Sequence, residues 1–399
     1  MDKLIVTQWK GRVCTASATD GRITQLMMEP EDAFSQLNHI YIGRVQKVVG
    51  NINAAFVDIG GGRTGYYSLD ENREHFFVNR PGGKLKAGDE IVVQVSRDAV
   101  KTKAPVLTGK LSFTGRYLVL TVGKTGIGFS AKIGDNRYKA RVKTVLGEAL
   151  AGDRDCFGLI VRTNGYNVED EVLLTEFERL KAMYRKLESE ARCRTCYSCI
   201  YQAVPGYIAA IRDSYQGSLD EIITDVPAYH EALRSYLMQY QTEDAGRLTL
   251  YQDSLLPLAK LYSLETALEH ALGRHVWLKS GGYLVIEPTE AMVVIDVNTG
   301  KYSGKKKMQE TIFRINMEAA DEIGRQLRLR NLSGIIMIDF IDMESLEDRE
   351  MLMRHLGEVV SKDPMKTTVV DMTRLNLVEM TRKKVRRPLY EQVSGEQQE

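Results

Sequence analysis

The sequence predicts a composite α/β protein of several domains, in which a small β-barrel precedes a strand–helix–strand segment. The chain has 399 residues, which is enough for about two to four domains with separate cores. Five short strand patterns with glycine-rich turns fall within residues 35–111. Two continuous apolar runs, at 291–298 and 334–342, flank an amphipathic helix pattern near the C-terminus.

The overall composition is that of a globular protein, with 43% hydrophobic residues, 27% charged residues and a net charge of +1. No apolar run approaches the ~20 residues that a membrane span needs, and the N-terminus lacks the pattern of a signal peptide. With five cysteines and no secretion signal, we expect a cytoplasmic protein without membrane contact. Two basic runs, at 305–307 and 382–387, are typical of solvated surfaces.

The N-terminal third predicts a short strand segment followed by the barrel. The first 34 residues hold two strand patterns with a turn at Asp20-Gly21. The later order G-x-V, A-A-F-V-D-I-G, G-Y and G-D-x-I-x-V-Q-V resembles the ribosomal-S1-type RNA-binding barrel, an OB-fold. In such barrels exposed aromatic residues stack bases. Phe56 and Tyr66 are the candidates, with core packing as the alternative role for each.

Residues 112–205 predict further strands, and the last of them runs into Arg162 and Thr163. A guanidinium and a hydroxyl after a buried strand can bind a phosphate, although this signal is weak by itself. Helical spacing of apolar residues predicts three further helices, at 170–190, 228–243 and 262–272.

The two C-terminal apolar runs each end in aspartate. Asp296 is followed by Asn298, and Asp339 is followed by Asp342. A right-handed strand–helix–strand crossover places both strands in one sheet and brings Asp296 and Asp339 together. Carboxylates that close repel each other and lose solvation, and a divalent cation relieves both effects. The pattern therefore favours an Mg²⁺-dependent enzyme over aspartates that only form turns or cap helices.

The longer motifs around these aspartates resemble the RNase E/G family of endoribonucleases. The matching segments are Ala291–Asn298, Asn316–Ile323, Arg325–Arg330, Ile338–Met343 and Leu377–Arg382. The resemblance spans about residues 1–390 and includes the order of barrel, Val161-Arg162-Thr163 and catalytic segment. It implies an Mg²⁺-dependent enzyme that cleaves single-stranded, A/U-rich RNA in RNA processing and decay, leaving 5′-phosphate and 3′-hydroxyl ends.

The resemblance also implies roles for individual residues. Asp296 and Asp339 match the two aspartates that bind one catalytic Mg²⁺, and Asn298 matches the asparagine that orients the attacking water or the scissile phosphate. Asp342 is left with a supporting role. The positions matched to RNA binding are Gly115, Val119, Arg162 and Thr163 for a stimulating 5′-monophosphate, and Phe56, Tyr66 and Lys103 for the barrel.

The same resemblance implies a domain layout. Residues 1–34 and 206–270 are expected to form an RNase H-like scaffold, interrupted by the S1-type barrel at 35–111 and a 5′-sensor region at 112–205. Residues 271–390 are expected to form a DNase I-like catalytic α/β domain. Residues 391–399 complete the chain as a tail.

Three positions depart from the family pattern near the 5′ pocket. Ala131 and Lys132 stand where the family has paired arginines, and Lys366 replaces a further arginine. Lysine keeps the charge but loses bidentate geometry, so we expect weaker discrimination for a 5′-monophosphate. No cysteine follows Cys199, so a homodimer is possible but not through the zinc link of the family.

Cys193, Cys196 and Cys199 form a C-x₂-C-x₂-C cluster that the family pattern does not include. Thiolates at this spacing can hold zinc, with Cys156 as a fourth ligand, or an iron–sulfur cluster. Reduced cysteines without a metal are the favoured interpretation. Three other functions stay open: a non-catalytic RNA-binding protein with the same fold, a metal- or redox-sensing regulator, and a structure-specific DNA nuclease.

Overall fold

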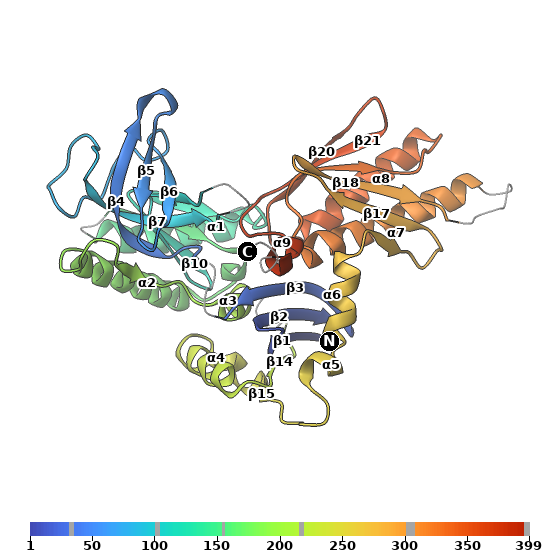
Figure 1. The fold of residues 1–399 in the computed structure, drawn as a ribbon, viewed down its shortest axis with the longest axis horizontal. Coiled ribbons are helices and arrows are strands. Elements are labelled where there is room, and N and C mark those ends of the chain that lie inside the picture. Colours follow the sequence, from blue (N-terminus) through green and yellow to red (C-terminus); the bar gives the residue numbers. More distant parts are fainter. Residues whose placement is uncertain (32–35, 100–103, 154–155, 215–218, 301–307, 395–399) are drawn as a thin grey trace. The chain divides into compact units, whose positions relative to one another are not determined.

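The structure is a computed structural model that describes residues 1–31, 36–99, 104–153, 156–214, 219–300 and 308–394 (Figure 1). The chain forms two compact units, one of residues 1–33 with 219–399 and the other of residues 34–218. Both units mix helices and strands, in agreement with the predicted α/β class. Within the described part of the chain, no helix has the length and apolar character to cross a membrane.

The first unit contains a sheet with the strand order β15-β14-β1-β2-β3. Its strands are β1 (Asp2–Trp9), β2 (Arg12–Thr19), β3 (Arg22–Pro30), β14 (Glu221–Thr224) and β15 (Leu248–Leu250). β1, β2 and β3 are antiparallel, whereas β14 and β15 continue the sheet in parallel from β1. The sequence predicted two strands here, and three are present. The predicted turn at Asp20-Gly21 joins β2 to β3, whereas the turn at Lys10-Gly11 that separates β1 from β2 was not predicted.

The helices associated with this first sheet include two of the predicted ones. Their bounds are α4 (Pro227–Tyr240), α5 (Leu258–Leu261), α6 (Leu264–Leu272) and α9 (Leu389–Val393), with a 3₁₀ helix at Thr242–Arg247. α4 and α6 confirm the helices predicted at 228–243 and 262–272, and the 3₁₀ turn explains why α4 ends earlier than predicted.

The second sheet of this unit has the strand order β16-β17-β18-β19-β21-β20. Its elements are β16 (His275–Trp277), β17 (Tyr283–Pro288), β18 (Met292–Asn298), α7 (Met308–Leu329), β19 (Gly334–Asp339), α8 (Leu346–Ser361), β20 (Thr367–Met372) and β21 (Leu377–Arg382). β18 and β19 are parallel neighbours connected through α7, as predicted. Alternate residues of these strands share one hydrophobic core with α7 and α8, so both helices pack on the same face of the sheet (Figure 1).

One basic run proves not to be a simple solvated surface. Arg382 is only 4% exposed, and its guanidinium binds the buried carboxylate of Asp363 at 2.8 Å. Arg382 also donates to the backbone oxygen of Leu332 at 2.9 Å, so it anchors the end of β21. The other run, 305–307, lies outside the described residues.

The second unit contains the predicted five-stranded barrel. Its strands are β4 (Ile40–Val49), β5 (Ala54–Asp58), β6 (Thr64–Ser68), β7 (Glu90–Arg97) and β8 (Val106–Thr108). They pair in the order β4-β5-β6-β8-β7, and an additional pairing of β7 with β4 closes the barrel. β13 (Cys199–Tyr201) also pairs with β4, so these residues join the barrel sheet although the sequence placed them in the neighbouring region.

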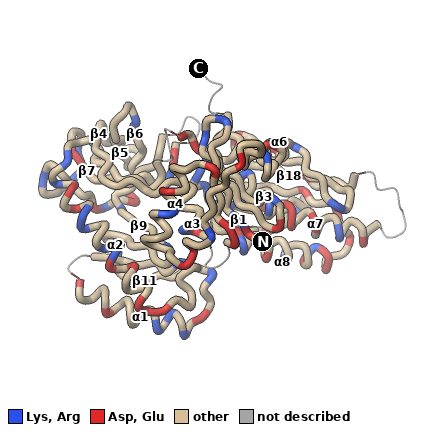
Figure 2. Tube along the Cα trace, turned by 90° about the horizontal axis from the view of Figure 1, so that it is seen from below, with Lys and Arg blue, Asp and Glu red and all other residues tan. Residues whose placement is uncertain are grey.

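The rest of this unit is a smaller sheet with helices. Its elements are β9 (Ser112–Thr114), β10 (Leu118–Val122), β11 (Gly126–Phe129), α1 (Asn136–Ala151), β12 (Phe157–Val161), α2 (Asp170–Ala191) and α3 (Gly206–Asp213), with 3₁₀ helices at Gly50–Ile52 and Thr163–Gly165. α2 confirms the helix predicted at 170–190. Acidic and basic residues are interspersed along α7 and α8 (Figure 2), in keeping with the small net charge.

Candidate active site and nucleic-acid interface

Asp296 and Asp339 occupy directly paired positions on β18 and β19. The residues before them, Ile295 and Ile338, are fully buried in the core with α7 and α8. Because side chains alternate along a strand, both carboxylates lie on the opposite face of the sheet, which we call the site face. Burial and the negative charges of Asp296 and Asp342 raise the pKa of Asp339.

Asn298 lies on the same face, two residues after Asp296. Its amide Nδ2 donates to Asp296 Oδ2 at 2.7 Å, which leaves the amide oxygen as an acceptor beside the carboxylates. The segment after β19 is held by Asn316, a fully buried residue of α7 that the sequence analysis did not single out. Asn316 donates to the backbone oxygen of Ile341 at 2.8 Å and accepts from its N–H at 3.1 Å.

The chemistry of these side chains fits a hard divalent cation. Carboxylate and amide oxygens are the ligands that Mg²⁺ prefers, and Mg²⁺ commonly uses one or two carboxylates while keeping several waters. Across the described ranges, no group of three or more His, Cys, Asp or Glu side chains is placed to hold a metal ion. A cation at this site would therefore rely on two carboxylates, with water and substrate oxygens completing its coordination.

A row of three side chains crosses the barrel surface on β4, β5 and β6. Lys47 pairs with Phe56, and Phe56 pairs with Tyr66. The two rings meet edge to face with centroids 6.2 Å apart, and Lys47 Nζ lies 4.9 Å from the Phe56 centroid. Both rings are half-buried, outside the core cluster of the barrel. A cation beside two accessible rings is the arrangement that single-strand binding uses. Lys47 was missed by the sequence analysis, and Lys103 lies outside the described residues.

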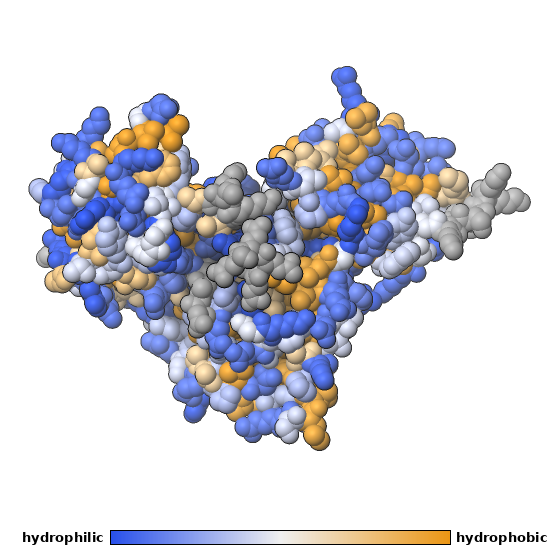
Figure 3. Space-filling model, in the orientation of Figure 1, coloured by the Kyte–Doolittle hydropathy of each residue, from blue (hydrophilic) through white to orange (hydrophobic). Residues whose placement is uncertain are grey.

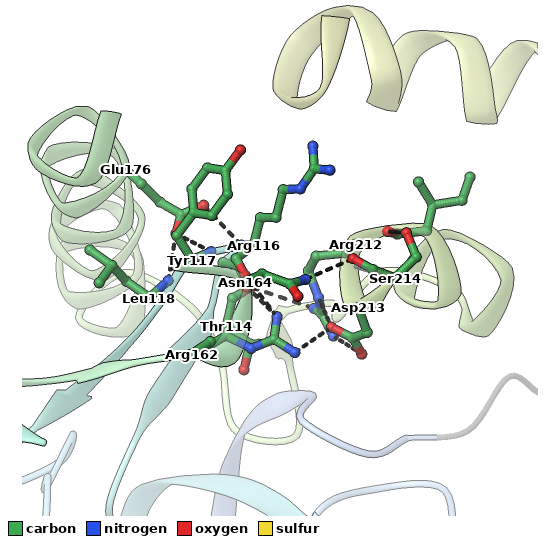
Figure 4. A network of polar contacts seen from close by, with 12 residues as sticks. Thr114, Arg116, Tyr117, Leu118, Arg162, Asn164, Glu176, Arg212, Asp213 and Ser214 are labelled. Atoms are coloured by element: carbon green, nitrogen blue, oxygen red, sulfur yellow. Dashed lines mark hydrogen bonds and ion pairs between the residues drawn. The ribbon is translucent and has the colours of Figure 1, made fainter. Parts of the chain in front are cut away.

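Arg162 follows β12, and its guanidinium makes contacts in two directions (Figure 4). Its Nη1 donates to the backbone oxygen of Gly115 at 2.6 Å, and its Nη2 binds Asp213 Oδ1 at 2.8 Å. The neighbouring Thr163 shares a hydrogen bond of 2.9 Å with the hydroxyl of Ser130. The Arg162 guanidinium thus contacts the Gly115 backbone, whereas the hydroxyl of Thr163 contacts Ser130.

Asp213, at the end of α3, lies between two guanidinium groups. Arg212 binds it through Nε at 2.9 Å and Nη2 at 3.1 Å, in addition to the contact with Arg162. Burial opposes the charged form, but the two arginines outweigh it and lower the pKa of the Asp213 carboxyl. Neither Arg212 nor Asp213 was predicted, because they are about 50 residues away in sequence and carry no motif.

The loop at Gly115 is shaped by Glu176 of α2. The backbone N–H groups of Arg116, Tyr117 and Leu118 donate to the Glu176 carboxylate at 2.8, 2.7 and 2.7 Å (Figure 4). A Cβ at position 115 would lie 2.5 Å from the Glu176 carboxyl carbon, so any larger residue there would have to displace this hydrogen-bonded carboxylate. Val119 lies four residues further on, in β10 opposite Thr114.

Comparison with known proteins identifies the family. Residues 112–385 match the model of the Ribonuclease E/G family. The chain belongs to this family. It is 34% identical over 396 residues to ribonuclease G of Escherichia coli (strain K12), covering 96% of this chain and 80% of that protein. For Haemophilus influenzae ribonuclease G the identity is 36% over 383 residues, with coverages of 92% and 77%. For ribonuclease E of Synechocystis it is 31% over 401 residues, with coverages of 98% and 58%.

The predicted family and enzyme class, an endoribonuclease, are therefore confirmed. In this ribonuclease E/G family member, the positions that depart from the family pattern have different surroundings. Ala131 is exposed in the turn after Ser130, one residue from the Ser130–Thr163 contact. Lys366 precedes β20 and belongs to the other compact unit.

The cysteine cluster lies in the loop between α2 and β13. Cys193 and Cys199 are exposed, and Cys196 is half-buried. The thiol of Cys196 faces the backbone oxygen of Ile42 at 3.9 Å, whereas the thiol of Cys199 faces that of Tyr201 at 3.3 Å. These thiols point to different backbone partners, and the part of the chain that the structure describes offers no metal-binding group there.

Proposed function

We propose that this endoribonuclease hydrolyses single-stranded RNA with one Mg²⁺ held by Asp296 and Asp339, in RNA processing and decay. The observation that carries the proposal is the direct pairing of these carboxylates on parallel strands, with Asn298 bonded to one of them. The raised pKa of Asp339 supports the proposal. Burial and neighbouring carboxylates destabilise its charged form, and a bound cation would offset that destabilisation.

Each residue of the site has a distinct task in this reaction. A bound Mg²⁺ supplies charge neutralisation at the phosphodiester and a lowered pKa for a coordinated water. Asn298 holds the Asp296 carboxylate in one orientation through Nδ2 and presents its amide oxygen to the attacking water or the phosphate. Asp342 is held by Asn376 at 2.9 Å and adds negative charge near Asp339. The expected products carry 5′-phosphate and 3′-hydroxyl ends.

The RNA-binding roles follow from the same reasoning. The row of Lys47, Phe56 and Tyr66 favours single strands, because paired bases hide their faces. Arg162 and Thr163, with the Gly115 loop and Val119, form the pocket for a stimulating 5′-monophosphate. A preference for A/U-rich segments and a cytoplasmic location without membrane contact belong to the same proposal.

The finer domain layout is also a proposal. The order β3-β2-β1-β14-β15, with three antiparallel strands and two parallel ones, supports an RNase H-like scaffold from residues 1–34 and 206–270. The sheet from β16 to β21 with α7 and α8 supports a DNase I-like domain at 271–390.

Metal removal tests the proposed function. A 5′-monophosphorylated, A/U-rich oligonucleotide is incubated with protein treated with EDTA, and Mg²⁺ is then restored. We expect no cleavage with EDTA, and recovery with Mg²⁺ to products with 5′-phosphate ends. If the protein binds RNA in Mg²⁺ but does not cleave it, the protein is a non-catalytic RNA-binding protein. If it cleaves single-stranded DNA equally well, it is a nuclease without a preference for RNA.

A further inference from the structure

An exposed tryptophan stands in register with the proposed active site. Trp277 on β16 pairs with Tyr283 on β17, and Tyr283 pairs with Asn298 on β18. Residues directly opposite one another in an antiparallel sheet point to the same face. Trp277 and Tyr283 therefore share the site face with Asn298 and the two aspartates. Neighbouring strands lie about 5 Å apart, so Tyr283 and Trp277 stand about 5 and about 10 Å across the sheet from Asn298.

The two rings form one surface. The centroids of Trp277 and Tyr283 are 5.1 Å apart with an interplanar angle of 52°, and the ring of His275 lies 5.8 Å from that of Tyr283. The Trp277 side chain is 71% exposed, although a large aromatic side chain gains from being covered. Apolar side chains also reach the surface over this part of the molecule (Figure 3). Ile335 on β19 is a further exposed apolar residue of the sheet, at 49% exposure.

The turn that connects the strands of Trp277 and Tyr283 is held by hydrogen bonds. The carboxylate of Glu318 on α7 accepts the backbone N–H groups of Lys279 at 2.6 Å and Ser280 at 3.1 Å. Burial raises the pKa of Glu318, but these hydrogen bonds outweigh it and lower that pKa overall, so the carboxylate remains charged. Leu278 N donates to the backbone oxygen of Gly282 at 2.8 Å and closes the turn.

The same turn approaches the end of β18 closely. A Cβ at Gly282 would lie 2.8 Å from the backbone oxygen of Asn298, and a Cβ at Gly300 would collide with the backbone oxygen of Gly281. Gly300 also has a φ of +66°, which favours glycine. Backbone contact of this kind fixes the distance between the aromatic pair and Asn298.

We infer that Trp277 and Tyr283 form a stacking platform for a base of the RNA next to the scissile phosphate. The inference rests on the proposed function, because the site face must be where the phosphodiester binds. Exposed aromatic rings stack bases without strong sequence preference, since every base has a π-face. The platform therefore contributes affinity and positions the strand, while Asp296, Asn298 and Asp339 act on the phosphate.

The test uses the small number of tryptophans in the chain. Only Trp9 and Trp277 are present, so a full-length Trp9→Phe variant reports on Trp277 fluorescence alone. We expect a short A/U-rich RNA to quench this fluorescence in EDTA, where cleavage is not needed. In Mg²⁺, Trp277→Ala should raise KM roughly five- to tenfold, in the lower range of base–aromatic stacking. Trp277→Phe should recover most of that loss.

A set of oligonucleotides with a single abasic site locates the stacked base. With the wild-type protein, KM should rise only for the oligonucleotide whose abasic site lies at one position beside the cleaved bond. With Trp277→Ala, the abasic oligonucleotides should all have the same KM. Absence of quenching together with an unchanged KM in Trp277→Ala would overturn the inference while cleavage itself stands. Trp277→Ala could instead change the molar mass in light scattering while KM stays unaltered. That result would show that Trp277 contacts a second copy of the chain, and it would also overturn the inference.

Discussion

Asp296 and Asp339 are direct partners on two parallel strands, and Asn298 donates a hydrogen bond of 2.7 Å to the first of them. The hydrophobic residues before the aspartates are buried on the other face with α7 and α8. The sheet therefore positions both carboxylates through its core, and the site does not depend on a loop for its geometry.

The ion pair between Arg162 and Asp213 should limit the proposed sensing of a 5′-monophosphate. Arg162 Nη2 donates to Asp213 Oδ1 at 2.8 Å, so the Asp213 carboxylate places a negative charge where a phosphate would bind. Asp213→Asn should increase the preference for a 5′-monophosphate over a 5′-hydroxyl by up to about fivefold, the scale of a partly exposed charge pair. Cleavage rates of the two RNAs measure this ratio. A lower ratio would mean that Asp213 only positions Arg162.

A gain of function is expected at Ala131. This exposed residue follows Ser130, whose hydroxyl contacts Thr163. Ala131→Arg should strengthen the 5′-monophosphate preference roughly tenfold, because a charge-assisted hydrogen bond contributes about 1.5–3 kcal/mol. Ala131→Gln provides a side chain of similar reach without the charge and should leave the preference unchanged. Equal effects of both substitutions would exclude a charge contact.

Phe56 should carry much of the affinity of the barrel for single-stranded RNA. Phe56→Ala removes the ring that lies between Lys47 and Tyr66 and should weaken binding roughly tenfold. Fluorescence anisotropy of a labelled oligonucleotide measures the dissociation constant, and Phe56→Tyr should retain the affinity because it keeps the π-face. If Phe56→Ala binds RNA with wild-type affinity, Phe56 has a packing role and does not stack bases.

We expect the stability of the barrel to decrease in acid because of Asp89. Arg80 donates to both oxygens of this carboxylate, at 2.7 and 2.6 Å, and lowers its pKa from the ordinary value of 3.8. The pair therefore stabilises the fold above about pH 4, and this contribution is lost as the pH falls through the lowered pKa. Asp89→Asn should lower the melting temperature at pH 7, and the difference from wild type should shrink towards pH 3. An equal difference at both pH values would contradict the assignment.

The sequence was sufficient to predict the pairing of Asp296 with Asp339 and much of the architecture. Two apolar runs that end in aspartate, with an amphipathic helix between them, predict neighbouring parallel strands and hence the contact of Asp296 with Asp339. The barrel was predictable for a similar reason, since short alternating strands and glycine turns follow one another along the chain.

Other features depend on register and on distant segments, which a single sequence does not encode locally. Trp277 reaches the site face only because β16, β17 and β18 pair in one particular register. Asp213 meets Arg162 about 50 residues away in sequence, through the packing of α3. The charged neighbours of Arg382 predict a solvated surface, and they carry no sign of its burial beside Asp363.

The most direct test of the proposed metal site is the Mg²⁺-dependent cleavage rate of Asp339→Asn, measured with a 5′-monophosphorylated A/U-rich RNA. The rate should fall by more than about a hundredfold, because even residues that only support metal ligands typically cost about 10- to 100-fold. RNA affinity should be retained through the barrel, and Asp342→Asn should have a smaller effect. Cleavage at the wild-type rate by Asp339→Asn would contradict the account.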